Sequence, residues 1–381
     1  MGAHAECLRD EGINVTIVAG RGRPAPRGVR VTRIPEADSR GAAIERDRDA
    51  LARGERPKTY DARVERLMRR LRPLVEKSDR VVVHNVMTMP FNFALTAALA
   101  RLAATDPGKV IAWTHDIAAF DPRYDPYDRP GTPCDLIRQA HTGVRYVTVS
   151  GLRADQWSQL TGLPRERISV VPNGIDVART LGLSRAGMHL AQRLGVYDAD
   201  PLLLQPVRVT RRKRIEAAIE ATKILRERGQ NAMLVVTGGV GPHDVKNRAY
   251  LRELAALAKQ VEGTKLLAAL GIRIAYDQVV DLYALADVLV FPSESEGFGL
   301  PMLEAGLHRM PIVCSDIPTL RETGGDEPIY VPPDASGAVI AQAIERAMDT
   351  AVMGMRRRAR AHAWPRVLRE RVLPVILEDR P

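Results

Sequence analysis

A segment near residue 300 combines two carboxylates with a glycine-rich run of backbone amides. Residues 291–305 read FPSESEGFGLPMLEA, which places Glu296 and Glu304 eight residues apart. An apolar run precedes the segment and a helical pattern follows it, and Pro301 suits the first position of that helix. The free N–H groups at a helix start act together with the helix dipole to bind anions. The amides concerned belong to Gly297, Phe298, Gly299 and Leu300.

The two carboxylates beside this anion site predict a ligand that carries hydroxyl groups as well as phosphate. We place Glu296 in the loop and Glu304 in the first turn of the helix, where both can face the same crevice. The alternative is that Glu304 is only an acid favoured by the helix dipole and that Glu296 is a solvated turn residue.

A second anion site is expected where an apolar run over residues 202–207 ends in a basic segment. Arg208 offers a planar fork of donors and Lys213 a compact point charge, a combination suited to a diphosphate. The carboxyl ends of strands are where an open parallel sheet binds its ligand. Residues 237–241 (Thr-Gly-Gly-Val-Gly) end a third strand, where Gly238 would let a base or a phosphate approach, although a plain tight turn fits equally well.

In the first half, two strands end in polar pairs. These pairs are His84 with Asn85, and His115 with Asp116. A histidine at the lip of a cleft can bind a sugar, position an acceptor or transfer a proton, and we favour His115 over His84 for such a role. The acidic residues of the loop over 121–128 lack the spacing of a metal cage, so we predict no metal site.

The elements that must position these residues are short β-branched runs alternating with helical-period stretches, the pattern of parallel sheets covered by helices. The helical spacing is clearest over residues 215–225 and 340–351. The predicted strands are residues 15–18, 29–34, 81–84, 110–113 and 146–150 in the first half, and 202–207, 232–237, 272–275, 288–291, 312–314 and 329–331 in the second.

Length and turn signals predict two domains, since 381 residues exceed one ordinary core. Pro172-Asn173-Gly174 is a strong turn signal, and no strand pattern follows before residue 202, so we place the boundary near residues 180–198. The expected domains are 1–185 and 198–362. Residues 363–381 form a separate amphipathic helix.

Composition indicates a folded protein with an excess of positive charge, which is concentrated in a few segments. Apolar residues make up 45%, the net charge is +10, and three cysteines cannot form a disulfide framework, so we expect a cytoplasmic protein without a membrane span. Arginines cluster at residues 21–33, 63–72, 208–214 and 356–360. Few of the 17 aromatic residues lie near them, which argues against nucleic acid as a partner.

Together these motifs resemble the retaining glycosyltransferases of family four, which have the GT-B architecture of two facing Rossmann-like domains with parallel sheets. The match is most specific from Glu296 to Glu304, the family's Glu-x7-Glu motif. It extends to Arg208 with Lys213, to residues 170–176 (VVPNGID), to His115-Asp116 and to the terminal helix, which in the family crosses back to the first domain.

The resemblance implies transfer of a sugar from a UDP-, GDP- or ADP-linked hexose to an acceptor hydroxyl, with no obligatory cofactor. Arg208 and Lys213 would stabilise the departing diphosphate, and Glu304 would hold the ribose. Glu296 and the amides of residues 297–300 would hold the donor sugar. His115 would lie near the reacting carbon, with His84, Asn85 and Asp116 on the acceptor side. The leaving phosphate oxygen would accept the acceptor's proton, so electrostatic stabilisation would dominate catalysis.

One departure concerns the beginning of the chain. Family members start with a strand and a Gly-rich loop, whereas residues 3–12 read as the end of a helix leading into a strand. We therefore expect that Met1 is not the natural start or that the chain is truncated.

Other functions remain open at this point. A GT-B epimerase or phosphorylase shares the fold, an arginine-rich polyanion-binding protein would need no transferase site, and a truncated chain could bind nucleotide without transferring sugar. The arginine clusters of the first half would favour an anionic acceptor or peripheral contact with the inner face of a membrane. The donor base, the sugar, the acceptor and the oligomeric state are not defined by these residues.

Overall fold

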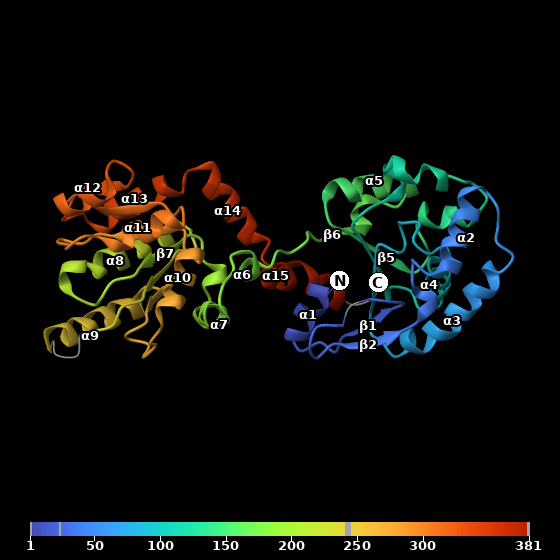
Figure 1. Ribbon diagram of the computed structural model, residues 1–381, viewed down its shortest axis with the longest axis horizontal. Coiled ribbons are helices and arrows are strands. Elements are labelled where there is room, and N and C mark those ends of the chain that lie inside the picture. Colours follow the sequence, from blue (N-terminus) through green and yellow to red (C-terminus); the bar gives the residue numbers. More distant parts are fainter. Residues whose placement is uncertain (1, 23, 241–244, 379–381) are drawn as a thin grey trace. The chain divides into compact units, whose positions relative to one another are not determined.

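The computed structural model describes residues 2–22, 24–240 and 245–378. The predictions that involve Met1, Arg23, Gly241 and residues 379–381 lie outside these ranges. The chain divides into two compact units, each described by itself (Figure 1). Unit 1 contains residues up to Gly174 and again from Trp364 on, and unit 2 contains Ile175–Ala363.

Within the described residues, unit 1 contains two parallel sheets. The first has the order β3-β4-β5-β6, and the second pairs β1 with β2. The strands are β1 (Thr16–Ala19), β2 (Arg30–Arg33), β3 (Val81–His84), β4 (Val110–Thr114), β5 (Val144–Thr148) and β6 (Ile168–Val170). The helices before the terminal segment are α1 (Gly2–Asp10), α2 (Ala42–Ala52), α3 (Tyr60–Glu76), α4 (Phe93–Thr105) and α5 (Gly151–Thr161).

The larger sheet of unit 1 is buried on both faces because its side chains alternate between two apolar clusters. Ala112 of β4 belongs to the cluster with α3 and α4, whereas its neighbours Ile111 and Trp113 pack with α1 and the terminal segment. That segment consists of α15 (Trp364–Val367), a π-helical turn over Leu368–Val372 and α16 (Leu373–Leu377). The end of the chain thus completes the core of unit 1.

The described part of unit 2 is built on one parallel sheet of six strands in the order β12-β11-β10-β7-β8-β9. The strands are β7 (Leu202–Gln205), β8 (Met233–Val236), β9 (Thr264–Leu266), β10 (Val288–Phe291), β11 (Ile312–Ser315) and β12 (Ile329–Val331). The helices are α6 (Val177–Thr180), α7 (Arg185–Leu194), α8 (Ile215–Glu227), α9 (Val245–Gln260), α10 (Tyr276–Leu285), α11 (Leu300–Leu307), α12 (Pro318–Gly324), α13 (Gly337–Met348) and α14 (Ala351–Ala361).

The fold class expected from the sequence is confirmed in its elements: two α/β units with parallel sheets, and a terminal helical segment that belongs to the first unit. The central strands β7 and β10 are buried throughout, as parallel strands covered on both faces must be. Their carboxyl ends lead into the two loops in which the donor-side residues were predicted.

One predicted strand is wrong. Residues 272–275 form no strand, and the sixth strand of unit 2 is β9, at the edge of the sheet. An edge strand has one open side and tolerates a charged residue such as Lys265, so its apolar signal is weak. Ile272 and Ile274 instead pack on the core from a loop, partly buried. β6 is also a three-residue edge strand and was not predicted.

The two units divide at Gly174–Ile175, which is earlier than the expected boundary near residues 180–198. The reason is that α7 docks on α10. The buried carboxylate of Asp281 accepts hydrogen bonds from the backbone N–H of Ser184 at 3.1 Å and from its hydroxyl at 2.6 Å. A Cβ at Gly187 would lie 1.9 Å from Asp281 Oδ2, so only glycine permits this contact. These residues therefore belong to unit 2.

α14 is also held in unit 2 by ion pairs to a buried aspartate. Asp287, which precedes β10 and is 3% exposed, accepts a hydrogen bond from the backbone N–H of Leu202 at 2.8 Å. Its other partners are Arg356, at 3.0 Å, and Arg360. Part of the basic cluster at residues 356–360 therefore holds a helix in place. Among the described residues, no helix is long and apolar enough to cross a membrane.

Candidate functional site

Lys213 lies at the carboxyl end of the central strand β7, in a single 3-10 turn over Arg211–Lys213. Its side chain is 9% exposed and forms an ion pair with the carboxylate of Glu296, whose side chain is 8% exposed. The ammonium also lies 5.3 Å from the ring centre of Phe291. Gln205, the last residue of β7, donates a hydrogen bond to the carbonyl oxygen of Lys213 at 2.9 Å. The predicted cation and the predicted loop carboxylate are thus in direct contact.

Arg212 joins the same two loops. Its guanidinium donates a hydrogen bond to the carbonyl oxygen of Ser295 at 2.6 Å and lies 3.7 Å from the carboxylate of Glu296. The backbone N–H of Glu294 in turn donates to the carbonyl oxygen of Arg212 at 2.8 Å. Burial lowers the pKa of Lys213, and the hydrogen bond to Glu296 opposes that shift. A pair of opposite charges is therefore held in a largely water-excluded place.

The amide run predicted at residues 297–300 surrounds the start of α11. Gly299 precedes the helix with φ +96°, a left-handed conformation that glycine adopts without strain. A Cβ at Gly297 would meet nothing within 4 Å, so open space lies beside this backbone. Phe298 is 54% exposed, and its carbonyl oxygen accepts a hydrogen bond from the hydroxyl of Thr323. The beginning of the helix thus presents backbone N–H groups next to free space.

The predicted place of Glu304 needs a correction. α11 begins at Leu300, so Glu304 is its fifth residue and lies beyond the first turn, which contains no acid. Attraction by the helix dipole falls off within the first turn and does not explain this carboxylate. Instead, Tyr276 donates to its Oε1 at 2.6 Å and Tyr283 donates to its Oε2 at 2.7 Å. Two hydroxyls from α10 therefore fix both carboxylate oxygens.

Arg208 and Gly238 lie on the loops that follow β7 and β8. Arg208 is exposed, and within the described part of the chain no hydrogen bond or ion pair joins it to Lys213 or Glu296. A Cβ at Gly238 would lie 2.1 Å from the carbonyl oxygen of Val207, so glycine is required for the packing of these two loops. The structure thus brings Lys213 and Glu296 together, gives Gly238 a packing role and leaves the side chain of Arg208 exposed.

In unit 1, the polar residues predicted on the acceptor side are joined by one asparagine. Asn85 has φ 58° and follows β3. Its side-chain oxygen accepts hydrogen bonds from the backbone N–H of His115 at 2.7 Å and of Asp116 at 3.2 Å, and its amide donates to the carboxylate of Asp116 at 3.2 Å. Arg153 of α5 lies 3.9 Å from Asp116. The ends of β3 and β4 therefore form one connected polar group.

His84 and His115 are stacked with their ring centres 5.5 Å apart, and His84 Nδ1 lies 3.2 Å from His115 Nε2. His4 of α1 packs edge-on against Trp113, with ring centres 4.7 Å apart. Burial lowers the pKa of His84 to about 3 and that of His4 to about 4, and it also lowers the pKa of His115. Near pH 7 these rings are neutral, so each can carry one N–H donor and one acceptor nitrogen.

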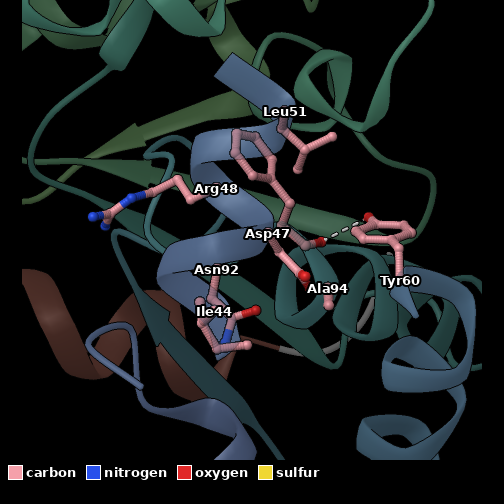
Figure 2. Close-up of a pocket in the computed structure, with 8 residues that line it drawn as sticks. Ile44, Asp47, Arg48, Leu51, Tyr60, Asn92 and Ala94 are labelled. Atoms are coloured by element: carbon pink, nitrogen blue, oxygen red, sulfur yellow. Dashed lines mark hydrogen bonds between the residues drawn. The ribbon is translucent and has the colours of Figure 1, made fainter. Parts of the chain in front are cut away.

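A small cavity in unit 1 contains none of the predicted site residues (Figure 2). It lies between α2 and the starts of α3 and α4, beside the hydrogen bond that Tyr60 donates to the carbonyl oxygen of Phe93 at 3.1 Å. Asp47, which lines it, forms an ion pair with the buried Arg63 at 2.8 Å. These contacts join three helices, which is a structural role.

Two family models match the chain. Residues 189–363 match the model described as Glycosyl transferases group 1, and residues 2–179 match the model described as Glycosyltransferase Family 4. The chain belongs to this glycosyltransferase family. The match to the second half includes β7, the turn with Lys213, the loop with Glu296 and α11, so the residues brought together in unit 2 lie inside the matched segment.

The individual relatives share only low sequence identity with this chain. A D-inositol 3-phosphate glycosyltransferase of Xylanimonas cellulosilytica is 30% identical over 304 residues, which cover 76% of this chain and 64% of that protein. A mannosylglucosylglycerate synthase of Petrotoga mobilis is 26% identical over 273 residues, covering 64% of this chain and 61% of that protein. The chain thus spans less than two thirds of the length of these relatives. A solved glycosyltransferase from Rickettsia africae aligns over 99% of this chain and 94% of its own, at 14% identity and a TM-score of 0.39.

Several residues of the site were not predicted from the sequence. Gln205 is a polar residue that follows three leucines in β7, and this pattern could have marked it as a candidate site residue. Tyr276 and Tyr283 are seven residues apart, a spacing that puts them on one face of a helix, but nothing in the sequence links that face to Glu304. Arg212 and His4 became recognisable only from their contacts.

Proposed function

We propose that this protein is a retaining glycosyltransferase that moves a hexose from a nucleoside diphosphate to an acceptor hydroxyl. The observation that carries the proposal is the buried Lys213, held against Glu296 at the carboxyl end of the central strand of unit 2. A buried cation at the ligand-binding edge of a parallel sheet, next to the amides of a helix start, suits a leaving diphosphate. Family membership supports the same reaction class.

The proposed role of Lys213 is to stabilise charge that develops on the leaving group. An ammonium has three N–H donors, so it can keep its bond to Glu296 and still donate to phosphate oxygens. Burial strengthens this interaction because little water competes for the charge. Arg208, exposed on the same loop after β7, would contact the diphosphate when the donor is bound.

The remaining donor contacts are part of the same proposal. The amides of residues 297–300 and the carboxylate of Glu296 would hold the hexose, and Glu304 would hold the ribose. Gly238 would let the donor approach the backbone of the β8 loop. In the reaction, the bond between the anomeric carbon and the diphosphate oxygen breaks, the acceptor oxygen bonds to that carbon on the same face, and the leaving oxygen takes the acceptor's proton.

The acceptor would be positioned by unit 1. The proposed residues are His84, Asn85, His115 and Asp116, of which His115 would lie near the reacting carbon. Because the ring of His115 is neutral, it would act as a hydrogen-bond partner rather than as a cation. An anionic acceptor forms part of the proposal, since the Xylanimonas relative is named for an inositol phosphate. Contact with a membrane surface would be tested separately, by sedimentation with anionic and neutral vesicles.

The first experiment is thermal stabilisation by UDP, GDP and ADP. A ligand that binds only the native state raises the melting temperature by mass action. We expect one of the three to stabilise the protein, Lys213→Ala to abolish the effect, and Lys223→Ala to retain it. Lys223 is a matched control because it is an exposed lysine of α8 that pairs with Glu227. If none of the three nucleotides stabilises the wild-type protein, the proposal is wrong.

The second experiment separates a transferase from enzymes of the same fold. The cognate nucleotide hexose is incubated alone, with phosphate, and with phosphorylated and unphosphorylated polyols. A transferase releases nucleoside diphosphate and forms an α- or β-glycoside of unchanged anomeric configuration only with the acceptor, which proton NMR of the product reports. Conversion of the donor alone would indicate an epimerase, and phosphate-dependent cleavage a phosphorylase.

A further inference from the structure

Tyr276 combines an exposed aromatic ring with an anchored hydroxyl. The residue is 63% exposed, and its hydroxyl donates to Glu304 Oε1 at 2.6 Å. Tyr283, which binds the other oxygen of Glu304, is 1% exposed and lies 3.3 Å from the carbonyl oxygen of Pro301. One buried tyrosine already fixes the carboxylate. The second tyrosine leaves most of its ring in solvent, which anchoring alone does not require.

Exposed aromatic rings are scarce in unit 2. Among its described residues, the large aromatic side chains that are exposed are Tyr276 and Phe298, at 63% and 54%. Phe298 lies in the amide run, and Tyr276 contacts the carboxylate proposed to hold the ribose. Both exposed rings of the unit therefore belong to the proposed donor site, whereas the other tyrosine of α10 is buried.

Tyr276 is also held in place before any ligand arrives. It is the first residue of α10, and the side chain of Gln278 fixes this helix start by accepting a hydrogen bond from the backbone N–H of Ala275 at 3.0 Å. The hydroxyl is fixed by Glu304 at the other end of the ring. A ring restrained at both ends loses little conformational entropy when a ligand stacks on it.

The carboxylate of Glu304 retains capacity for a ligand. Its two oxygens together offer about four lone-pair positions, of which the two tyrosines occupy one on each oxygen. One position per oxygen is left, which matches the two adjacent hydroxyls of a ribose. The base of a nucleoside is bonded directly to its ribose, and of the two tyrosine rings beside Glu304 that of Tyr276 is the exposed one.

We infer that Tyr276 is the stacking platform for the base of the bound nucleotide, and that its hydroxyl orients Glu304 toward the ribose. This inference rests on the proposed donor site and assigns its nucleoside end. Base stacking on an aromatic ring tolerates any base, because every base has a π-face. Tyr276 therefore accounts for binding of a nucleoside as a class, and selection among bases falls to other groups.

The test compares binding of a nucleoside diphosphate with binding of inorganic pyrophosphate, which has no base or ribose. Calorimetry would measure the best of UDP, GDP and ADP, and pyrophosphate, against the wild-type protein, Tyr276→Ala, Tyr276→Phe, Glu304→Ala and Leu270→Ala. Leu270 is a matched control because it is a 51% exposed residue that precedes α10 and is not among the residues proposed to bind the donor.

We expect Tyr276→Ala to raise the Kd of the nucleoside diphosphate about ten- to a hundredfold, the range for loss of one aromatic stack. Tyr276→Phe keeps the ring and should stay within about threefold of the wild type, since water can replace the lost hydroxyl at Glu304. The Kd of pyrophosphate should be unchanged in both variants, which also shows that they are folded. Leu270→Ala should bind both ligands like the wild-type protein.

Two results would overturn the inference in different ways. If Glu304→Ala weakens nucleotide binding while Tyr276→Ala does not, the donor site stands and the stacking role is wrong. If Tyr276→Phe and Tyr276→Ala weaken binding equally, the residue acts only as a support for Glu304. Failure of the wild-type protein to bind any of the three nucleotides would instead remove the proposed function, and the inference with it.

Discussion

Replacing Lys213 by alanine should separate the contribution of this side chain to stability from its contribution to the reaction. In the folded protein its ammonium and the carboxylate of Glu296 form an ion pair in which both side chains are less than 10% exposed. Removing one partner of a buried pair typically costs about 3–5 kcal/mol, because the other charge stays buried and uncompensated. Arg212 remains 3.7 Å from Glu296, so we expect about 3 kcal/mol, the lower end of that range.

The double variant with Glu296→Ala should recover most of this stability, because it removes both buried charges. We expect it to lie within about 1 kcal/mol of the wild-type protein. Activity should behave differently. Loss of a charge-stabilising group at the leaving diphosphate should lower kcat/KM by about two to three orders of magnitude, and the second substitution should not restore it. Stability would thus recover when Glu296→Ala is added, whereas activity would not.

The assay must report on unit 2 alone. All three tryptophans, at positions 113, 157 and 364, belong to unit 1, so tryptophan fluorescence is insensitive to unfolding confined to unit 2. Hydrogen exchange of peptides that cover β7 and β10 measures the local opening free energy at the strands that precede Lys213 and Glu296. Tryptophan fluorescence in urea then serves as an internal control. The reasoning is refuted if the double variant opens as readily as Lys213→Ala, or if its activity recovers.

Three further predictions test other contacts. Asp287→Asn should destabilise unit 2 by about 3–5 kcal/mol, since two arginines of α14 lose their buried partner, and faster exchange in β7 would report it. Asn85→Ala should lower the stability of unit 1 by about 2 kcal/mol, as the N–H of His115 loses its acceptor, and an unchanged urea midpoint by tryptophan fluorescence would contradict this. Acid should destabilise unit 1. In the folded protein, burial holds the pKa of His4 at about 4 and that of His84 at about 3. In the unfolded chain both imidazoles have a pKa near 6.5, so the unfolded state binds protons first as the pH falls. Stability is then lost as pH falls below 6.5, by roughly 2 kcal/mol per histidine at pH 5, and His4→Gln should reduce that loss.

The sequence predicted the strands well wherever both faces of a strand are buried. The run at residues 288–291 is apolar throughout because it lies in the middle of the sheet, and the structure has β10 over the same residues. The prediction failed at the edge, where β9 contains Lys265, and residues 272–275 (Ile-Arg-Ile-Ala) form a loop. An edge strand needs fewer apolar residues, and a loop that packs on the core can look like a strand, so local pattern cannot separate the two.

For the site, the sequence identified side chains but not their partners. Lys213 and Glu296 were both predicted as ligand-binding residues, yet their ion pair joins positions 83 residues apart in the chain. Glu304 was assigned to the first helical turn, and the structure shows that two tyrosines hold it instead. Such contacts depend on how α10 and α11 pack in three dimensions. The spacing of residues along one element therefore carries no information about them.

The position of Lys213 in an arginine-rich chain has a physical explanation. Only eight of the 56 basic residues are lysines, and among the residues the structure describes, the buried cations are Arg63, Lys109 and Lys213. Arg63 is neutralised by Asp47 alone, in a structural contact. Lys213 pairs with Glu296 above the ring of Phe291, and the proposed role adds a ligand at the same ammonium. A compact ammonium with three rotating donors can serve both partners, whereas a planar guanidinium would direct its fork at one of them. Buried Lys109 pairs with Asp106, and arginines such as Arg63 and Arg360 bind carboxylates within the fold, so among the buried cations Lys213 best suits an exchangeable anion.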